Sequence, residues 1–331
     1  MIVYKLCCGR TLCTSSDLLT TASRHFRRSV NSTKHKSVKL YPQETSSGKV
    51  RGQVTSRTLG NLRKPLLFTL SIGGISYAGC SVWQHERLRS LSTNIFGSYR
   101  TQLITHSGSW RNELNRWWNE STLGQRAVYS IAAINLGVLL MFRIPSLTPY
   151  MVKYFTASAY RTNMCWPMLL SVFGHYSLIH YGLNMYVLHS FSGVVADRIM
   201  GLEQFVGFYL TAGCFASLCG YAFKIISKSA VPSLGASGAI LAVLAFTCCE
   251  FPDARLSIVF LPMFTFSATH ALIGIIGFDI AGLALGWRTF DHAAHLGGSM
   301  FGIWYATHGK KYWAKYRHLI VRRWITLTGR S

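Results

Sequence analysis

Gly235-Ala236-Ser237-Gly238 opens a segment of about 17 small and apolar residues that ends near Phe251, and this segment decides the fold. A second apolar segment contains His295. Polar side chains are costly inside lipid-spanning helices, so each one marks a candidate functional site. Together the two segments predict a membrane protein that holds a hydroxyl and an imidazole in its interior.

The composition of the whole chain supports a membrane fold. Half of its 331 residues are hydrophobic, only 14% are charged, and the mean hydropathy is +0.24. These values fit a polytopic membrane protein better than a pair of soluble domains. The nine cysteines show neither a Cys-x-x-Cys motif nor a Cys/His zinc spacing, so we predict no disulfide framework and no metal site.

The first 64 residues have the composition of a targeting segment. They contain 13 Lys or Arg residues against only Asp17 and Glu44, within a net charge of +23 for the chain. A basic, hydroxyl-rich, acid-poor N-terminus without a continuous apolar run is typical of a mitochondrial presequence. The alternative is a disordered basic arm that binds acidic lipid or nucleic acid. We predict the presequence, and no nucleic-acid partner.

Apolar runs then mark the candidate membrane spans. About 20 helical residues are needed to cross a hydrocarbon core about 30 Å thick. One candidate stands apart from six crowded ones, which predicts an all-α polytopic membrane protein, a six-helix bundle with one additional N-terminal transmembrane helix. The expected spans are Leu66–Trp83, Ala127–Leu147, Pro167–Phe191, Gln204–Ile226, Gly235–Phe251, Leu256–Phe278 and Asp291–His308.

The stretch between the first two spans is an expected interfacial linker. Trp110, Trp117 and Trp118 lie beside arginines there, as in helices that rest at the headgroup level. A soluble helix that binds a partner is the alternative. Basic residues crowd both ends of the membrane region, so the sequence leaves the orientation open. The expected parts are a presequence at 1–64, an extra transmembrane helix at 65–84, the linker at 85–125, the core at 126–309 and a basic tail at 310–331.

Ser237 is the candidate nucleophile. Gly235 and Gly238 free the backbone to turn sharply beside it and leave no Cβ to obstruct a bound carbonyl group. The amides around Ser237 are expected at a helix N-terminus, where N–H groups lack intrahelical partners and the helix dipole favours an oxyanion. Packing of small residues between helices is the alternative meaning of this motif.

His295 is the candidate base, because a neutral imidazole accepts a serine proton within hydrogen-bond reach. His295, Gly298 and Gly302 follow one another at i, i+3 and i+7 on one helix face. This face lacks side-chain bulk, so we expect it to contact the small residues behind Ser237 closely. A histidine that makes only structural hydrogen bonds is the alternative.

His180 and Asn184 lie four residues apart on one side of a helix and are candidate donors to an oxyanion. Hydrogen bonds that only join two helices are the alternative. No carboxylate is expected beside the base, because Glu250 falls at a helix end and Asp279 and Asp291 bracket a loop. The sequence therefore predicts a Ser/His dyad rather than a triad.

In this order the motifs resemble those of the rhomboid intramembrane serine proteases: His180-x-x-x-Asn184, Gly235-x-Ser237-Gly238, and Ala294-His295 followed by Gly298-x-x-x-Gly302. The resemblance covers about residues 120 to 310. The extra first helix and the basic N-terminus are similar to mitochondrial members of the family. So are three stretches, Pro167-Met168-Leu169-Leu170-Ser171, Asn184-Met185-Tyr186-Val187-Leu188 and Asp291-His292-Ala293-Ala294-His295-Leu296-Gly297-Gly298.

The resemblance implies a rhomboid-like bundle and a mechanism. Ser237 would attack the scissile carbonyl carbon, and His295 would act first as a base and then as an acid towards the leaving amine. The backbone N–H of Ser237 and the side chains of His180 and Asn184 would hold the oxyanion. His175 would structure the cavity or its water.

The resemblance also implies how substrates arrive. A substrate helix would enter laterally near 256–278, with Pro262 and Phe264 at the gate, and 148–166 would form the family's membrane-embedded hairpin. The protein itself would be a multi-pass protease of the mitochondrial inner membrane. Its substrates would be single-span membrane proteins, cleaved in or near helices that unwind readily, without a cofactor. The sequence predicts neither their identity nor the oligomeric state of the chain.

Other membrane functions fit the sequence less well. A zinc intramembrane protease needs His-Glu-x-x-His, but His85-Glu86-Arg87-Leu88-Arg89 lacks the second histidine. An aspartyl intramembrane protease needs two aspartates inside membrane helices, and none is expected there. Two alternatives stay open. One is a catalytically silent rhomboid-like protein that binds membrane clients, and the other is a transporter with a polar pathway along His175, His180, His189 and His295.

Overall fold

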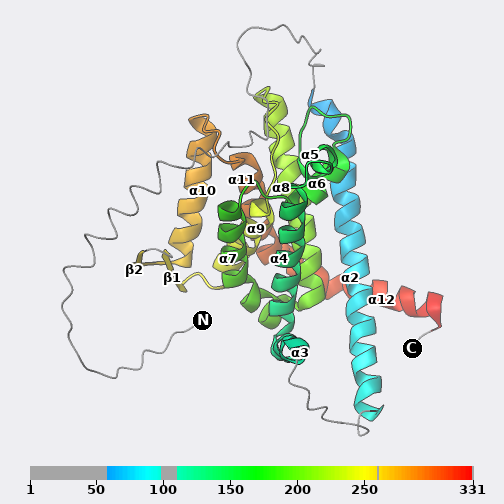
Figure 1. Ribbon diagram of the computed structural model, residues 1–331. Coiled ribbons are helices and arrows are strands. Elements are labelled where there is room, and N and C mark those ends of the chain that lie inside the picture. Colours follow the sequence, from blue (N-terminus) through cyan, green and yellow to red (C-terminus); the bar gives the residue numbers. More distant parts are fainter. Residues whose placement is uncertain (1–57, 98–109, 259–260, 330–331) are drawn as a thin grey trace, which may run out of the picture. The chain divides into compact units, whose positions relative to one another are not determined.

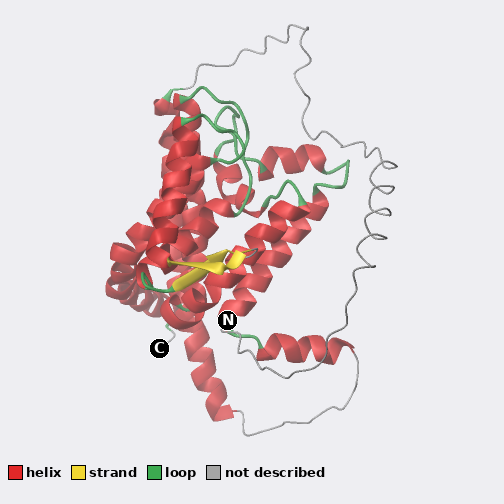
Figure 2. Ribbon diagram, turned by 90° about the vertical axis from the view of Figure 1, so that its left-hand side faces the viewer, coloured by secondary structure: helices red, strands yellow, loops and turns green. Residues whose placement is uncertain are grey.

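The computed structural model of the protein describes residues 58–97, 110–258 and 261–329, so the expected presequence lies, up to residue 57, outside them. The described chain is mainly helical, as predicted, with one β-hairpin (Figure 1 and Figure 2). Its α-helices are α2 (Arg63–Gly97), α3 (Trp110–Glu120), α4 (Leu123–Met141), α5 (Thr148–Phe155), α6 (Cys165–Leu170), α7 (Leu178–Val194), α8 (Leu202–Ile226), α9 (Ser237–Glu250), α10 (Ala268–Ala284), α11 (His292–Trp304) and α12 (Lys310–Thr328). The other elements are the 3₁₀ turns η1 (Leu59–Leu62) and η2 (Ser171–Phe173), the π-helical turns η3 (Val195–Met200) and η4 (Tyr305–Gly309), and the strands β1 (Arg255–Ile258) and β2 (Leu261–Ser267).

The helix α9 lies at the centre of the bundle (Figure 1). It packs against α11, α8, α7 and α10, and its Ala242, Val243, Ala245 and Phe246 are fully buried. Its 14 residues rise about 21 Å, less than the thickness of about 30 Å of a hydrocarbon core. A central helix this short leaves room at one end for a cavity within the membrane.

Several expected spans correspond to apolar helices of the structure. Of the described helices, α4, α8 and the stretch Leu59–Ser92 are long and apolar enough to cross a membrane, and α9 and α10 are shorter apolar helices. The start of α4 shows why a helix begins there. Thr122 and Gln125 form a capping box, and Asp197 of η3 accepts the Gly124 N–H at 2.6 Å, which places a carboxylate at the positive end of the helix dipole.

The expected span Pro167–Phe191 is wrong, because two short helical turns and a loop precede α7. A Cβ at Gly174 would lie 2.9 Å from the carbonyl oxygen of Phe155, so the chain bends where only glycine fits. Ser177 then caps α7 by accepting the backbone N–H of His180 at 3.1 Å. A glycine and a capping serine thus interrupt a run that is apolar in composition.

The expected span Leu256–Phe278 is also wrong. Residues 255–258 and 261–267 pair as antiparallel strands, in which Arg255 lies opposite Ser267, with an irregularity between Ser257 and Ile258. Pro262 lacks an N–H group and favours an extended conformation at the residue before it, so an apolar run that contains it is a poor helix. The helix α10 therefore begins at Ala268 and continues to Ala284, six residues beyond the expected end.

The regions outside the core contain three helices. The first span continues as α2 to Gly97, the exposed tryptophans of the linker lie on the helix α3, and residues 310–328 of the basic tail form α12. Arg87 of α2 pairs with the buried Glu203 of α8, and the Tyr77 ring stands edge-on to Trp313 of α12 with ring centres 5.0 Å apart. The extra N-terminal helix is therefore attached to both the core and the C-terminal helix.

Candidate active site

Ser237 is the first residue of α9, as expected. The segment before it is held by a backbone bridge between Ser233 and Ala157, with N···O distances of 2.7 and 2.9 Å, and by the Gly235 N–H, which donates to a carbonyl of η2 at 3.0 Å. Gly235 has a φ of +140°, and a Cβ there would lie 3.0 Å from the ring of His180. Both the backbone conformation and the close imidazole therefore require glycine at this position.

His295 faces Ser237 from α11, and its Nε2 atom lies 2.9 Å from the serine Oγ. Both residues are partly exposed. The helix that carries His295 begins at the right place because Asp291 caps it, accepting the N–H of Ala294 at 3.2 Å. The predicted contact between the hydroxyl and the imidazole is present, at a distance that permits proton transfer.

Small residues bring the two helices this close. A Cβ at Gly298 would lie 2.0 Å from the carbonyl oxygen of Gly238, and a Cβ at Gly302 would lie 2.2 Å from that of Ala242. Real Cβ atoms do not approach other atoms this closely, so α11 touches the backbone of α9 along two turns. The two small-residue faces therefore pack directly against each other.

Asp279 does not lie at a loop edge. Because the hairpin displaces the start of α10 along the sequence, Asp279 falls inside this helix and is 1% exposed. Its Oδ1 atom lies 3.2 Å from Nδ1 of His295. The expectation that no carboxylate stands beside the base is therefore wrong. A carboxylate at Nδ1 favours the tautomer in which Nε2 is free to accept the proton of Ser237.

His292 is a further member of this cluster that the sequence reasoning missed. Its Nδ1 lies 2.7 Å from the same Oδ1 of Asp279, and its ring fills the space beside Gly282, where a Cβ would lie 2.4 Å from Nε2. The i, i+3 spacing of His292 and His295 on one helix was the available signal. The ligand atoms of Asp279, His292 and His295 lie within 4.8 Å of one another, a spacing suited to a metal ion. The absence of a metal stays a prediction.

The expected oxyanion donors lie on α7, next to Ser237. His180 and Asn184 each line a cavity that Ser237 also lines, and the Asn184 side-chain amide donates to the His180 carbonyl at 3.1 Å. His175 precedes α7 and is buried, with its ring centre 4.9 Å from that of His180. Burial and then the neighbouring His180 lower the pKa of His175 to about 4, so this imidazole is neutral at physiological pH.

Comparison with known proteins identifies the family. The sequence profile of the Rhomboid domain matches residues 162–311. The chain is 45% identical over 268 residues to "Presenilin-associated rhomboid-like protein, mitochondrial" of Bos taurus and over 269 residues to the Homo sapiens protein of that name, covering 80% of this chain and 71% of each relative. The chain belongs to the rhomboid family.

More distant rhomboid relatives agree with this assignment. "Rhomboid protein 1, mitochondrial" of Saccharomyces cerevisiae is 32% identical over 192 residues, which cover 57% of this chain and 55% of that protein. This rhomboid is therefore a member of an intramembrane protease family and a multi-pass mitochondrial membrane protein.

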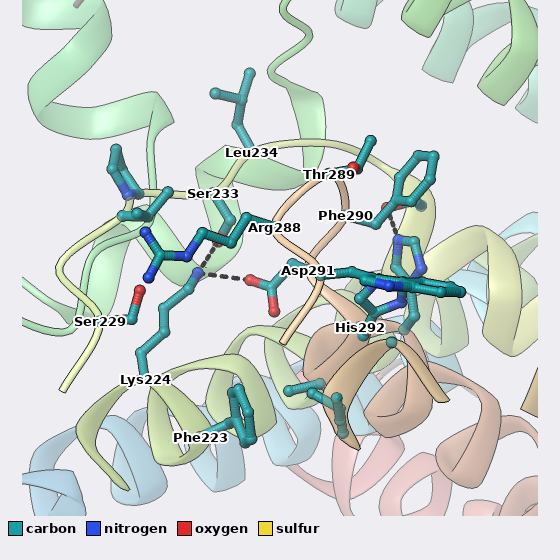
Figure 3. A pocket seen from close by; sticks show the side chains of 18 of the residues that line it. Phe223, Lys224, Ser229, Ser233, Leu234, Arg288, Thr289, Phe290, Asp291 and His292 are labelled. Atoms are coloured by element: carbon teal, nitrogen blue, oxygen red, sulfur yellow. Dashed lines mark hydrogen bonds and ion pairs between the residues drawn. The ribbon is translucent and has the colours of Figure 1, made fainter. Parts of the chain in front are cut away.

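Two cavities of this rhomboid meet at Ser237 and His295. The first, which we call the vestibule, has a volume of about 740 Å³ and is lined by α7, the end of α8 and the segments 227–234 and 286–293 (Figure 3). The second, which we call the lateral groove, has a volume of about 570 Å³ and runs between α7, α9 and α10. Most of its lining side chains are apolar, among them Val187, Leu241, Leu244, Phe266, Ile275 and Phe278.

Both expected gate residues, Pro262 and Phe264, belong to β2. Phe264 does not line the lateral groove. Phe266 at the end of β2 and one face of α10 form this wall instead. The expected hairpin at 148–166 is the helix α5 followed by a loop, in which Ala157 pairs with the segment before Ser237.

A buried ion pair joins the elements that carry Ser237 and His295. Lys224 at the end of α8 lies 2.6 Å from the Asp291 carboxylate and donates to the hydroxyl of Ser233 at 2.7 Å (Figure 3). The lysine is 7% exposed. Because Asp291 caps α11 and Ser233 precedes α9, this pair fixes the starts of both helices relative to each other.

Proposed function

We propose that the chain is a serine endopeptidase of the mitochondrial inner membrane, which cleaves single-span membrane proteins in or near their membrane segments. Ser237 is the nucleophile and His295 the general base. The observation that carries this proposal is the 2.9 Å contact between Ser237 Oγ and His295 Nε2, at the junction of the two cavities.

The geometry supports the usual two steps of acyl transfer. His295 Nε2 accepts the Ser237 proton as Oγ attacks the scissile carbonyl carbon, and the resulting imidazolium then protonates the leaving amine, which leaves an acyl enzyme. Water from the vestibule attacks the ester, the same nitrogen accepts its proton, and this proton returns to Ser237. Asp279, at Nδ1, is a positioning residue that holds the imidazole and stabilises its charge.

The N-terminus of α9 supplies donors for the tetrahedral intermediate. The N–H of Ser237 stands in the first turn, where backbone donors lack intrahelical partners and the helix dipole is positive. The side chains of His180 and Asn184 flank it on α7. Removal of one such donor typically costs about 2.7 to 4 kcal/mol in transition-state stabilisation.

The two cavities suit a substrate that leaves the lipid. The apolar lateral groove between α7, α9 and α10 accommodates a helix from the bilayer, and the vestibule accommodates the extended polar chain that follows it. Because a protease needs an extended peptide at its nucleophile, substrate helices that contain glycine or other helix-breaking residues near the cleaved bond are favoured.

The test is cleavage of a single-span reporter by the full chain in proteoliposomes, with fluorophosphonate labelling as a second measurement. Wild type is expected to cleave and to be labelled, and Ser237→Ala and His295→Ala to lose cleavage while keeping the wild-type melting temperature. Ser190→Ala is a matched control, because this exposed serine bonds only a carbonyl of its own helix, at 2.8 Å. Cleavage by either dyad variant overturns the proposal. Binding of the reporter without any cleavage or labelling identifies a silent client-binding protein instead.

A further inference from the structure

The vestibule carries a positive charge that the catalytic mechanism does not use. Lys224 and Asp291 neutralise each other in its wall. Arg288, in the loop between α10 and α11, lines the same cavity and is exposed. Within the described residues, none of the ion pairs involves Arg288. In Figure 3 its guanidinium extends across the cavity wall towards Ser229, while Lys224 is joined to its partners.

The described connections near the vestibule contain no unpaired carboxylate that could form an ion pair with Arg288. Three connections lie at one end of the bundle, at 142–177, 227–236 and 285–291 (Figure 1), and residues of all three line the vestibule. All three are described by the structure, and together they contain one acidic residue, Asp291, which Lys224 already occupies. The basic residues of these connections are Arg143, Lys153, Arg161, Lys228 and Arg288.

We propose that the vestibule binds an acidic side chain of the substrate, and that Arg288 is the residue that recognises it. The proposal rests on the proposed protease function, since it names the chemistry of the chain that this site accepts. A guanidinium presents a planar fork of donors that matches a carboxylate in two parallel hydrogen bonds. An Arg288 that is exposed and has no acidic partner in the described chain is free to form them with a ligand.

The dimensions of the vestibule limit where the acidic residue lies. A sphere of 740 Å³ is about 11 Å across, and about three extended residues span that distance. Because the lateral groove holds the apolar part of the substrate, the acidic side chain belongs to the extramembrane side, within about three residues of the cleaved bond. The preferred substrate is therefore an apolar helix followed closely by aspartate or glutamate.

The test compares reporters that differ in one residue. Glu, Gln or Lys is placed at each of the first four positions on the extramembrane side of the cleaved bond, and kcat/KM is measured in phosphatidylcholine proteoliposomes, whose lipid carries no net charge. Wild type is expected to prefer Glu over Gln about tenfold at one or two positions, the size of one charge-assisted pair at a partly exposed site. Arg288→Gln is expected to abolish this preference, so that it cleaves the Glu and Gln reporters equally well, and Arg288→Glu is expected to prefer the Lys reporter.

Lys153→Gln is the matched control. Lys153 is an exposed basic residue in the connection 142–177, but it does not line the vestibule, so its loss is expected to leave the preference for Glu intact. Equal cleavage of the Glu and Gln reporters by wild type overturns the proposal, as does a preference that survives Arg288→Gln or that Lys153→Gln removes equally. Fluorophosphonate labelling separates the two levels of inference. If wild type is labelled and active but shows no preference for Glu, only the role of Arg288 is overturned. If wild type is neither labelled nor active, the proposed protease function itself is overturned.

Discussion

Substitution of Gly298 by alanine tests whether contact between two helices sets the geometry of the site. Gly298 lies one helical turn after His295 on α11, and a Cβ added to it would stand 2.0 Å from the carbonyl oxygen of Gly238 on α9. Contacts of a Cβ below 3.0 Å essentially do not occur, and nine in ten exceed 3.4 Å. The blocking atom is backbone, which cannot rotate away, so α9 and α11 must separate by at least about 1 Å.

That separation acts directly on the proposed catalytic contact. The distance from Ser237 Oγ to His295 Nε2 is 2.9 Å, and an increase of about 1 Å takes it beyond hydrogen-bond reach. Misplacement of a catalytic group by about 1 Å costs about 100-fold in rate. The strain of one extra methyl group in a tightly packed contact costs about 1 to 3 kcal/mol of stability. We therefore expect Gly298→Ala to fold, to melt at a lower temperature and to cleave the reporter about 100-fold more slowly.

Two further glycines make this test specific. A Cβ at Gly137 of α4 would meet nothing within 4 Å, so Gly137→Ala introduces the same methyl group without a clash and is expected to retain wild-type activity. Gly302→Ala produces a similar clash, 2.2 Å from the Ala242 carbonyl oxygen, one turn farther from His295. Gly302→Ala is expected to lower the melting temperature as much as Gly298→Ala does but to reduce the activity less, because α11 can tilt about the end that carries His295. Reporter cleavage, fluorophosphonate labelling and thermal unfolding measure all three variants. Activity of Gly298→Ala within threefold of wild type would refute the reasoning.

Three other perturbations follow from the buried polar contacts. Asp279→Asn keeps the shape of the side chain but removes its charge, and it is expected to lower kcat about 100-fold or more with little change in KM, as steady-state cleavage would measure. Lys224→Met leaves a buried carboxylate unpaired and is expected to cost about 3 to 5 kcal/mol, part of which Asp291→Asn restores in the double variant, a recovery that thermal unfolding would detect. Arg87→Met, which leaves a fully buried glutamate of α8 unpaired, is expected to lower the melting temperature by several degrees, whereas Arg89→Met, whose partner is partly exposed, should change it little.

The sequence predicts much of this fold because apolar length and small-residue spacing act locally. The expected boundaries of the spans that became α8 and α9 lie within two residues of the observed ones. The contact of Ser237 with His295 followed from a different rule, in which Gly298 and Gly302 remove side-chain bulk where a second helix approaches. Both rules use only the order of residue types along one helix, which is why a single sequence is sufficient for them.

Hydropathy predicted the wrong helix boundaries where a non-helical segment is as apolar as the helices on either side of it. Residues 255–258 and 261–267 belong to an apolar run, yet they pair as two strands, because Pro262 cannot join a helical hydrogen-bond ladder. The break at Gly174 is of the same kind, since that glycine is required by the nearby Phe155 carbonyl, a contact that no local pattern encodes. In both places the position of a helix start depends on what lies across the bundle.

The position of Asp279 shows how one such error extends to chemistry. With α10 placed too early in the sequence, this aspartate fell at a loop edge, and the base was left with an Nδ1 atom that had no acceptor inside a membrane protein. An unpartnered polar group in that environment costs several kcal/mol, so the missing acceptor was itself a reason to search for one. In the structure the Ser237 hydroxyl and both ring nitrogens of His295 have partners, and the Asp279 carboxylate that completes this series of contacts also lies against Nδ1 of His292. Because a polar residue buried in a membrane protein requires a hydrogen-bond partner, each such residue in a sequence predicts a second one nearby. A serine and a histidine placed in the bilayer by sequence imply a third group, even when its own position along the chain argues against it.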